Sequence, residues 1–515
     1  MPGDRVLILS VDGGTWRVLE PLAQRGVMAF VREMMAGGRC DLQSTIPPVT
    51  APAWTSYLTC VSPPRHQTYE FQAFDRQERR LKFLPDVCDL PTGWDHLEAL
   101  GEPYCCVGVP MMYPAGDRQC GVVVCGLDAP GAEAAFSSEQ VRRLAGSDYE
   151  LMLPMQRYGS DASFVRHAAE IEERHAALTL ELADRYPWRI FQHHVQSTDL
   201  VQHRLWHRVE RCLAQGDTIL EDFYRRVDAV LERVCQGCKP DFCVLMSDHG
   251  FRPVRKVISL NRWLLDHGYL RQARKVRPWG RLLSLARKLD VLDLRRLILP
   301  HRRLWTNILA EAHFSAFDFD RSVGFVANGI VLGHLFVCAG ASPVRVAELL
   351  RELEGLKDPS SGQQVIQAVL SHQEAFGQPP GRYGPDYFLV PADGYQFCDA
   401  ALFARWLRAV APGDVRFGTG GHDMSGIFCV SGGVAVGLTR QPRLMDVFPT
   451  VLHLAGLPGM KGVEGRSCVE VAGRGVPGPV ELDMATGRKL TRRGRSYSAE
   501  QEQTIAGRLR GLGYF

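Results

Sequence analysis

The sequence lacks an excess of charge of either sign, and it lacks long apolar runs. Its 515 residues contain 60 Lys and Arg against 57 Asp and Glu, which gives a formal net charge of +3. A chain so close to neutral gives no overall reason to expect a nucleic-acid partner. No apolar run approaches the roughly 20 residues that span a bilayer, so we expect no transmembrane segment. Charges follow the first residue closely and no small-residue cleavage site appears, so we expect no signal peptide and a cytoplasmic protein.

The sequence also lacks the features of a disulfide framework or a structural zinc site. Its fifteen cysteines are odd in number and scattered, and without a secretory signal we expect reduced thiols. Cys235 and Cys238 form one CxxC pair, but no second ligand pair stands at a suitable spacing. We therefore interpret this pair as small buried side chains beside the strand expected from residue 241.

Short apolar runs without alternation recur along the chain, and helical patterns lie between several of them. Such runs are typical of central parallel strands that are buried on both faces. They lie at residues 5–11, 40–49, 105–109, 122–124, 190–195, 242–246, 324–332 and 426–430, with helical patterns at 164–186 and 219–234. This alternation predicts an α/β fold, in which helices flank the sheet and functional residues gather at the carboxyl ends of the strands.

One segment departs from this pattern. Residues 271–303 contain eleven Lys and Arg against two acids, with leucines at amphipathic spacing, so the rest of the chain sums to −6. We expect a basic helical insertion, and three interpretations stay open. It is a solvated helical pair packed on the main lobe, a lid that adds positive charge above a phosphate-bearing substrate, or an amphipathic helix that contacts a membrane surface.

Five short motifs stand at turn positions, mostly directly after apolar runs. They are DG at 12–13, PPVTAPAWTS at 47–56, TDLVQH at 198–203, SDHG at 247–250 and GGHD at 420–423. Each is weak alone, although Asp199 and His203 are spaced i and i+4 and so could chelate one ion from a helix face. Together, three Asp, three His and a hydroxyl suit two zinc-like ions bound through nitrogen and oxygen.

The order of these motifs resembles that of the alkaline phosphatase superfamily. It is most similar to the type I phosphodiesterase/nucleotide pyrophosphatase branch, and within it to a group of predicted phosphohydrolases or phosphomutases. The stretches TIPPVTAPAWTSYLT, STDLVQHRLW, SLNRWLLDHGYL and DVFPTVLHLAGLP carry the resemblance as well. It runs from Asp12 to the C-terminus, and it is poor at 129–163 and in the basic insertion.

The resemblance implies a mostly parallel central sheet with inserted cap or lid elements. Residues 1–268 and 314–515 would form the catalytic core, 129–163 a cap element and 269–313 a lid. One divalent ion, most simply Zn²⁺ with Mn²⁺ as the alternative, would be held by Asp12, Thr50, Asp248 and His249. A second ion would be held by Asp199, His203 and His422.

The resemblance also makes Thr50 the nucleophile. Coordination to a dication lowers the pKa of a hydroxyl, and two ions can clamp the attacking and leaving oxygens of an in-line displacement. Thr50 would attack phosphorus and form a phosphothreonine, which water then hydrolyses. The sulfatase branch is disfavoured, because it needs Cys or Ser at this position and Arg where Trp54 stands.

The sequence departs from the nucleotide pyrophosphatase pattern in one respect, because no Asn stands near Thr50. Stabilisation of the phosphoryl oxygens would then come from backbone N–H groups near Ala51 or from other side chains. On location alone, the candidate substrate-binding residues are Ala51, Ser56, His193 and Arg204. This departure weakens the inference from the resemblance that the substrate is a nucleotide.

We therefore expect a two-metal hydrolase that cleaves a phosphodiester or pyrophosphate in a small substrate, with a nucleotide-type molecule as the leading example. A phosphomonoesterase is the first alternative, although no Arg or Lys adjoins Thr50 to bind a dianionic phosphate. A phosphotransferase would use the same residues if an alcohol replaced water. A catalytically inactive, metal-dependent binding module is the alternative of another class, and the presence of all seven expected metal-site residues disfavours it.

Overall fold

The computed structural model describes residues 4–83, 90–153, 158–273, 317–327, 329–398, 405–412, 418–473, 475–480 and 497–511. The chain forms two compact units. Unit 1 comprises Met1–Phe71, Leu84–Arg255 and Val410–Phe515, and unit 2 comprises Gln72–Phe83 and Lys256–Ala409. Nearly all of the basic insertion lies outside the described residues, so its three interpretations stay predictions. Among the described helices, none combines the length and apolar character that a membrane span requires.

Unit 1 is built on a seven-stranded sheet in the order β2-β17-β8-β1-β7-β5-β6. The strands are β1 (Val6–Val11), β2 (Arg39–Gln43), β5 (Tyr104–Val109), β6 (Gly121–Cys125), β7 (Ile190–Val195), β8 (Phe242–Met246) and β17 (Ser425–Gly432). All are parallel except β17, which pairs antiparallel with β2 and β8. β1 lies at the centre and every residue in it is buried, as its unbroken apolar run predicts.

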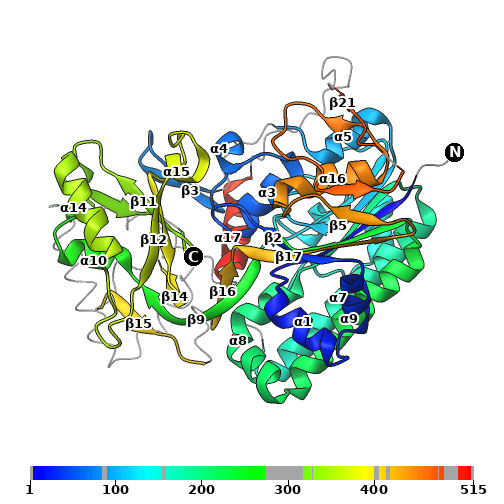
Figure 1. The fold of residues 1–515 in the computed structure, drawn as a ribbon, viewed down its shortest axis with the longest axis horizontal. Coiled ribbons are helices and arrows are strands. Elements are labelled where there is room, and N and C mark those ends of the chain that lie inside the picture. The colour runs from blue at the N-terminus through cyan, green and yellow to red at the C-terminus, as the bar shows by residue number, and fades with distance from the viewer. Residues whose placement is uncertain are drawn as a thin grey trace. The chain divides into compact units, whose positions relative to one another are not determined.

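Helices cover both faces of this sheet (Figure 1). His193 of β7 contacts Thr179 of α7, whereas the next residue, His194, contacts Trp54 of α3, so these two helices lie on opposite faces. The main helices are α1 (Trp16–Gln24), α2 (Ala29–Ala36), α3 (Thr50–Thr59), α5 (Gly93–Leu100), α7 (Asp161–Arg185), α8 (Ser197–Gln215), α9 (Thr218–Cys238), α16 (Val447–Leu454) and α17 (Ala499–Gly511). Shorter elements are α4 (Pro63–His66), α6 (Glu139–Ala145), β16 (Gly420–Asp423), β18 (Val436–Leu438), β19 (Gly459–Met460), β20 (Val469–Val471) and β21 (Pro479–Val480).

Unit 2 contains small, mostly antiparallel sheets with its own apolar core. One sheet has the order β10-β11-β13-β12, and in another β9 pairs with β14 and β15. Its core includes Trp263, Phe325, Phe336 and Leu389. The elements are β3 (Gln72–Asp75), β4 (Arg80–Phe83), the end of β9 (Gly250–Ile258, of which residues 250–255 belong to unit 1), α10 (Leu260–Asp266), β10 (Gly324–Val326), β11 (Gly333–Val337), α14 (Pro343–Glu354), β12 (Ile366–Ser371), α15 (His372–Phe376), β13 (Tyr387–Pro391), β14 (Gly394–Phe397) and β15 (Leu407–Ala409).

The α/β fold predicted from the sequence is confirmed, because a mostly parallel sheet with helices on both faces forms unit 1. Two expected strands differ. The run at 40–49 forms a strand only as far as Gln43, and most of this strand is not buried. The run at 324–332 forms a strand only at β10, which ends at Val326, and β11 begins after the run at Gly333. Between them Gly329 has a positive φ of 88°, which marks a turn. The division into core, cap element and lid stays a prediction.

Candidate metal centre

Three neighbouring strands of unit 1 bring acidic side chains to one edge of the sheet. Asp12 directly follows β1, and Asp248 stands two residues after β8. Asp199 lies in the first turn of α8, which follows β7. Because β1 pairs in parallel with both β7 and β8, the carboxyl ends of all three strands meet at this edge.

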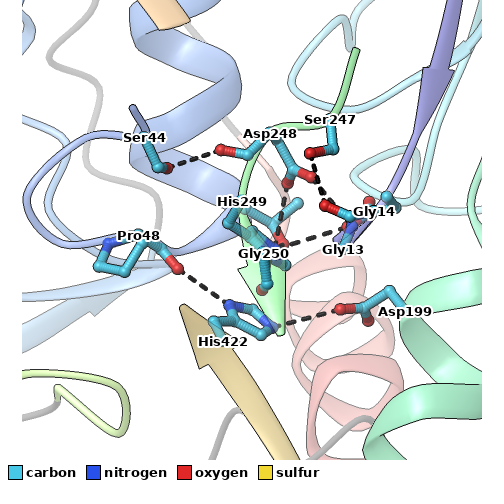
Figure 2. Close-up of polar contacts among 12 residues, drawn as sticks. Gly13, Gly14, Ser44, Pro48, Asp199, Ser247, Asp248, His249, Gly250 and His422 are labelled. Carbon is cyan, nitrogen blue, oxygen red and sulfur yellow. Dashed lines mark hydrogen bonds and ion pairs between the residues drawn. The ribbon is translucent and has the colours of Figure 1, made fainter. Parts of the chain in front are cut away.

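Asp199, His203 and His422 form a first group, which we call cluster 1. His203 Nε2 lies 2.8 Å from His422 Nε2 and 3.4 Å from Asp199 Oδ1. His422 Nε2 lies 3.2 Å from the same carboxylate oxygen (Figure 2). The i and i+4 pair therefore shares one face of α8, as expected, and β16 supplies the third side chain.

Asp12, Thr50, Asp248 and His249 form a second group, cluster 2. His249 Nε2 lies 3.2 Å from Asp248 Oδ2 and 3.5 Å from Asp12 Oδ1. It also lies 3.5 Å from the Thr50 hydroxyl, which stands at the start of α3. The rings of His249 and His422 are stacked with centroids 3.6 Å apart, so the two clusters adjoin.

The three histidines share one orientation, in which Nδ1 faces a backbone carbonyl and Nε2 faces the clusters. Nδ1 lies 3.1 Å from Gly420 O in His203, 3.1 Å from Gly250 O in His249 and 3.0 Å from Pro48 O in His422. A carbonyl can only accept, so in each neutral ring Nδ1 carries the proton and donates. The lone pair of each Nε2 is then directed into the clusters, as in metal-ligating histidines.

Two glycines allow the backbone to approach these side chains closely. Gly13 has a φ of +64° and its N–H donates to Asp248 Oδ1 at 3.2 Å, while an added Cβ would lie 2.7 Å from the Phe251 ring. At Gly250 a Cβ would lie only 2.0 Å from Ser425 O. The glycines after Asp12 and His249 are thus required by local packing and conformation.

Burial and nearby charges shift the pKa values of the three acids. Burial raises the pKa of both Asp12 and Asp248 well above the ordinary value, and the nearby charges of Asp199 and of Asp12, respectively, raise it further. For Asp199 burial also raises the pKa, but the electrostatic attraction of His203 and His422 outweighs it and the net shift is downward. The acids of cluster 2 therefore repel one another, whereas cluster 1 is balanced by imidazole.

Burial and nearby charges also shift the pKa values of the histidines. Burial lowers the pKa of His249 to about 4 and also lowers the pKa of His422. Burial lowers the pKa of His203 as well, but the charge of Asp199 outweighs it and the pKa rises. His249 is therefore neutral near pH 7 and can offer its Nε2 lone pair.

The residues of both clusters fit divalent cations. Asp12 Oδ1, Asp199 Oδ1 and Asp248 Oδ2 are buried and accept no hydrogen bond within the described part of the chain. Burying such carboxylate oxygens is costly unless a cation compensates them. Their ligand atoms gather with imidazole nitrogens within 4.8 Å of one another in two sets that share His249. Carboxylate oxygen and imidazole nitrogen are ligands of Zn²⁺ and Mn²⁺, so the donor chemistry suits two such ions.

The four predicted substrate-binding residues are dispersed. Ala51 lies in the first turn of α3, where backbone N–H groups have no helical partner. The other three side chains contact different groups: Ser56 Oγ lies 2.8 Å from His66 Nε2, His193 Nδ1 lies 2.8 Å from Thr179 Oγ1, and Arg204 lies 3.3 Å from Asp161. Roles for these residues in binding substrate stay predictions.

Two residues next to the clusters were not expected from the sequence. His194 Nε2 lies 3.3 Å from Asp12 Oδ2. Glu172 of α7 accepts the backbone N–H groups of Gln196 and Ser197 at 3.1 and 2.8 Å, so it caps α8, whose own N-cap side chain makes no such bond. Strand alternation would assign His193 and His194 to opposite faces, but β7 is buried on both faces and the pattern does not say which face holds the site.

Comparison with known proteins decides the family. The family described as "Type I phosphodiesterase / nucleotide pyrophosphatase" matches residues 6–302, which is more than half of the chain. The chain belongs to this family. The resemblance found in the motifs is thereby confirmed, and the matched range includes six of the seven cluster residues. A comparison with curated proteins finds no significant match.

One similar solved structure agrees with the fold, and a second is similar to a lesser degree. Phosphonoacetate hydrolase from Sinorhizobium meliloti 1021, in complex with phosphonoacetate, is similar with a TM-score of 0.60 at 16% identity, over 88% of this chain and 96% of that chain. The human ectonucleotide pyrophosphatase / phosphodiesterase 5 aligns with 88% of this chain over 96% of its own length, with a TM-score of 0.49 at 13% identity. Together with the family, the clusters make this chain a metal-dependent hydrolase of phosphate esters or anhydrides.

Proposed function

We propose that this enzyme cleaves a phosphodiester or a pyrophosphate, with a nucleotide-type substrate favoured, through a covalent phosphothreonine at Thr50. Cluster 2 and cluster 1 would each hold one divalent ion, with Zn²⁺ favoured over Mn²⁺. When bound, the ions supply positive charge that lowers the pKa of the attacking hydroxyl and stabilises the phosphoryl oxygens. We place the enzyme in the cytoplasm, which cell fractionation would test.

The observation that carries the proposal is the shared tautomer of the three histidines. Each ring donates Nδ1–H to a carbonyl and turns Nε2 toward buried carboxylate oxygens. Histidines that ligate a metal commonly donate their other ring N–H to a carbonyl, which orients the ring and leaves the second nitrogen for the ion. An arrangement of this kind argues against an inactive module that binds no metal.

Thr50 is well placed as a nucleophile by its own helix. It is the first residue of α3, it is buried, and its hydroxyl lies near His249 Nε2. The backbone N–H groups of the first turn, including that of Ala51, carry the positive end of the helix dipole and favour an anionic phosphoryl group beside Thr50. Pro52 follows without disrupting the helix, since the first turn needs no donor there.

The sequence around Thr50 favours one substrate class. No Lys or Arg stands between residues 40 and 64, so the chain near the nucleophile offers no side-chain cation for a dianionic terminal phosphate. A diester or an internal pyrophosphate, with fewer charges on the attacked phosphorus, fits this better than a monoester.

Parallel rate measurements on the full chain test the proposal. With Zn²⁺ bound, we expect hydrolysis of bis-p-nitrophenyl phosphate and of a dinucleotide pyrophosphate to exceed that of p-nitrophenyl phosphate. Thr50→Ala should lower kcat by roughly 10³-fold or more while the protein stays folded. The matched control is Thr55→Ala in the same helix, because the Thr55 hydroxyl only donates to Ala51 O, at 2.7 Å. It should leave kcat nearly unchanged.

Each other result identifies an alternative. Faster monoester cleavage would indicate a phosphomonoesterase, and transfer to an added alcohol in preference to water would indicate a phosphotransferase. Phosphonoacetate belongs in the panel because one fold neighbour is named for its hydrolysis. A protein that binds no Zn²⁺ and cleaves none of these compounds would overturn the proposal, and one that binds Zn²⁺ but cleaves none of them would favour a catalytically inactive, metal-dependent binding module.

A further inference from the structure

A chain of buried polar side chains runs behind Asp12. Tyr57 OH donates to Gln192 Oε1 at 2.8 Å, and Gln192 Nε2 donates to Ser10 Oγ at 3.0 Å. Ser10 Oγ lies 3.1 Å from His194 Nδ1, and His194 Nε2 lies 3.3 Å from Asp12 Oδ2. All five residues are at most 1% exposed, so water does not compete for these contacts.

The direction of each hydrogen bond follows from the one before it. The Tyr57 hydroxyl can donate to the carbonyl oxygen of Gln192, which turns the amide nitrogen toward Ser10. Ser10 Oγ then accepts from that nitrogen and has one proton to give. Of its two acceptors, His194 Nδ1 at 3.1 Å is nearer than the His193 carbonyl oxygen at 3.3 Å. The contact of His194 Nε2 with Asp12 Oδ2 at 3.3 Å decides between them, because a lone pair on Nε2 would repel the carboxylate. Nε2 therefore carries the ring proton and Nδ1 accepts from Ser10.

This assignment determines the tautomer of His194. In neutral imidazole one nitrogen accepts and the other carries the proton. Since Nδ1 accepts from Ser10, the ring proton is on Nε2, which faces Asp12. Nε2 is buried and makes no hydrogen bond of normal geometry in the described part of the chain, and Asp12 Oδ2 lies 3.3 Å from it. His194 is thus the reverse of the three cluster histidines, whose protons are on Nδ1, and it offers a donor instead of a lone pair.

Packing keeps the ring in this position. The Trp54 ring meets the His194 ring edge to face with centroids 4.9 Å apart. Ser10 and His194 are paired neighbours in the β1–β7 register, so their side chains lie on the same face of the sheet. Trp54 and Tyr57 both belong to α3, the helix that begins with Thr50.

We propose that His194 is a positioning residue for Asp12: its Nε2–H holds Oδ2 of the carboxylate, so that Oδ1 is directed into cluster 2. The chain from Tyr57 supplies the tautomer that this needs, and it ties Asp12 to the helix of the nucleophile. Hydrogen bonds to ligating carboxylates orient the ligand, and their loss commonly costs 10- to 100-fold in metal affinity. The inference rests on the proposed function, in which cluster 2 holds a divalent ion.

Two substitutions of similar size separate the two nitrogens of His194. His194→Gln places an amide nitrogen near the position of Nε2, so a donor toward Asp12 remains. His194→Asn places its amide near Nδ1, so it can meet Ser10 but does not reach Asp12. A structural role in packing would be affected by both changes, whereas positioning of Asp12 should be lost in the Asn variant alone.

The measurement is equilibrium competition for Zn²⁺ between the full chain and a chromophoric chelator. In an Asp199→Ala background, where cluster 2 alone is intact, we expect His194→Asn to weaken Zn²⁺ binding by about 10- to 100-fold. His194→Gln should stay within about threefold of its parent. In an Asp12→Ala background, where cluster 1 alone is intact, neither substitution should change the affinity. Thermal unfolding of the metal-free proteins should give similar midpoints for both variants.

The outcomes distinguish failure of this inference from failure of the proposed function. If the parent chain binds no Zn²⁺, the metal clusters themselves are wrong. If the parent chain binds two ions but His194→Asn leaves cluster 2 unchanged, or weakens both clusters equally along with a lower unfolding midpoint, His194 does not position Asp12. Equal losses in the Gln and Asn variants would also overturn the inference.

Discussion

Replacing Asp248 by Asn should stabilise the metal-free protein while removing its stabilisation by Zn²⁺. Asp248 Oδ1 accepts the Gly13 N–H, whereas its buried Oδ2 accepts no hydrogen bond in the described part of the chain. Asparagine keeps the acceptor for Gly13. Its amide nitrogen replaces the unpaired oxygen and presents a donor to Asp12, so one of two repelling charges disappears.

The size of the effect follows from the distance between the charges. The ligand oxygens of Asp12 and Asp248 lie within 4.8 Å of each other. At that separation two unit charges repel by about 3.5 kcal/mol with an effective dielectric constant near 20. A proton bound by either carboxyl already relieves part of this, because burial raises the pKa of both groups. We therefore expect Asp248→Asn to stabilise the metal-free protein by about 1–3 kcal/mol.

Asp228→Asn is the matched control. Both oxygens of Asp228 accept backbone N–H groups, from Phe30 and Val31, each at 2.9 Å. An amide can accept with only one atom, so this variant should lose about 1–2 kcal/mol as α2 loses part of its cap. The same chemical change should thus have opposite signs at the two positions.

The assay is urea unfolding after dialysis against a chelator and again with Zn²⁺ in excess. At a free concentration of 100 times the Kd, one bound ion stabilises the native protein by about 2.7 kcal/mol. The wild type should gain this stabilisation at cluster 2, and Asp248→Asn should not. The reasoning is refuted if metal-free Asp248→Asn is less stable than the wild type, or if the variant retains the full gain from Zn²⁺.

Three further predictions concern pH, a helix cap and a turn. The folded pKa of both acids in cluster 2 is raised, so their own contribution to the stability of the metal-free protein falls as pH rises from about 4 through these raised values. Buried histidines such as His249, whose pKa is lowered, contribute with the opposite sign, so the prediction concerns a difference. The stabilisation of metal-free Asp248→Asn over the wild type should increase with pH across this range, and a difference in urea midpoints that stays constant or decreases would contradict this. Glu172→Ala removes the cap of α8, so it should lower the free energy of unfolding by about 1–2 kcal/mol and weaken Zn²⁺ binding in cluster 1. Glu172→Gln keeps an acceptor and should recover much of the stability and of the Zn²⁺ affinity. Equal losses in the two variants would refute a capping role. Gly13→Ala would place a side chain at a φ of +64° and a Cβ 2.7 Å from the Phe251 ring, so it should lower the free energy of unfolding by at least about 1 kcal/mol. An unchanged free energy of unfolding in a denaturant titration would show that this turn is not constrained.

Much of the site could be predicted because its residues stand at the carboxyl ends of strands. Asp12 and Asp248 follow apolar runs that form β1 and β8, and those strands are neighbours in the sheet. The spacing of Asp199 and His203 already placed them on one helix face. Motif order then related these segments to one family, which the match to residues 6–302 confirms.

What could not be predicted depends on contacts between distant segments. The tautomer of His422 is set by the carbonyl of Pro48, which is 374 residues away in the chain. His194 and His193 are adjacent in a strand buried on both faces, and only the packing of α3 and α7 shows which of them faces Asp12. Composition likewise could not say whether the basic insertion is a lid, since that depends on where it packs.

The central claim is that Thr50 attacks phosphorus, and the most direct test is to identify the residue that carries the covalent intermediate. The Zn²⁺-loaded enzyme would be mixed with bis-p-nitrophenyl phosphate, quenched in acid during the first turnover and digested for mass spectrometry. Attack by Thr50 expels one p-nitrophenolate and leaves the p-nitrophenyl phosphoryl group on its oxygen, so the peptide that contains Thr50 should carry that added mass, and Thr50→Ala should not. An adduct on another residue, or rapid hydrolysis by Thr50→Ala without an adduct, would contradict the account.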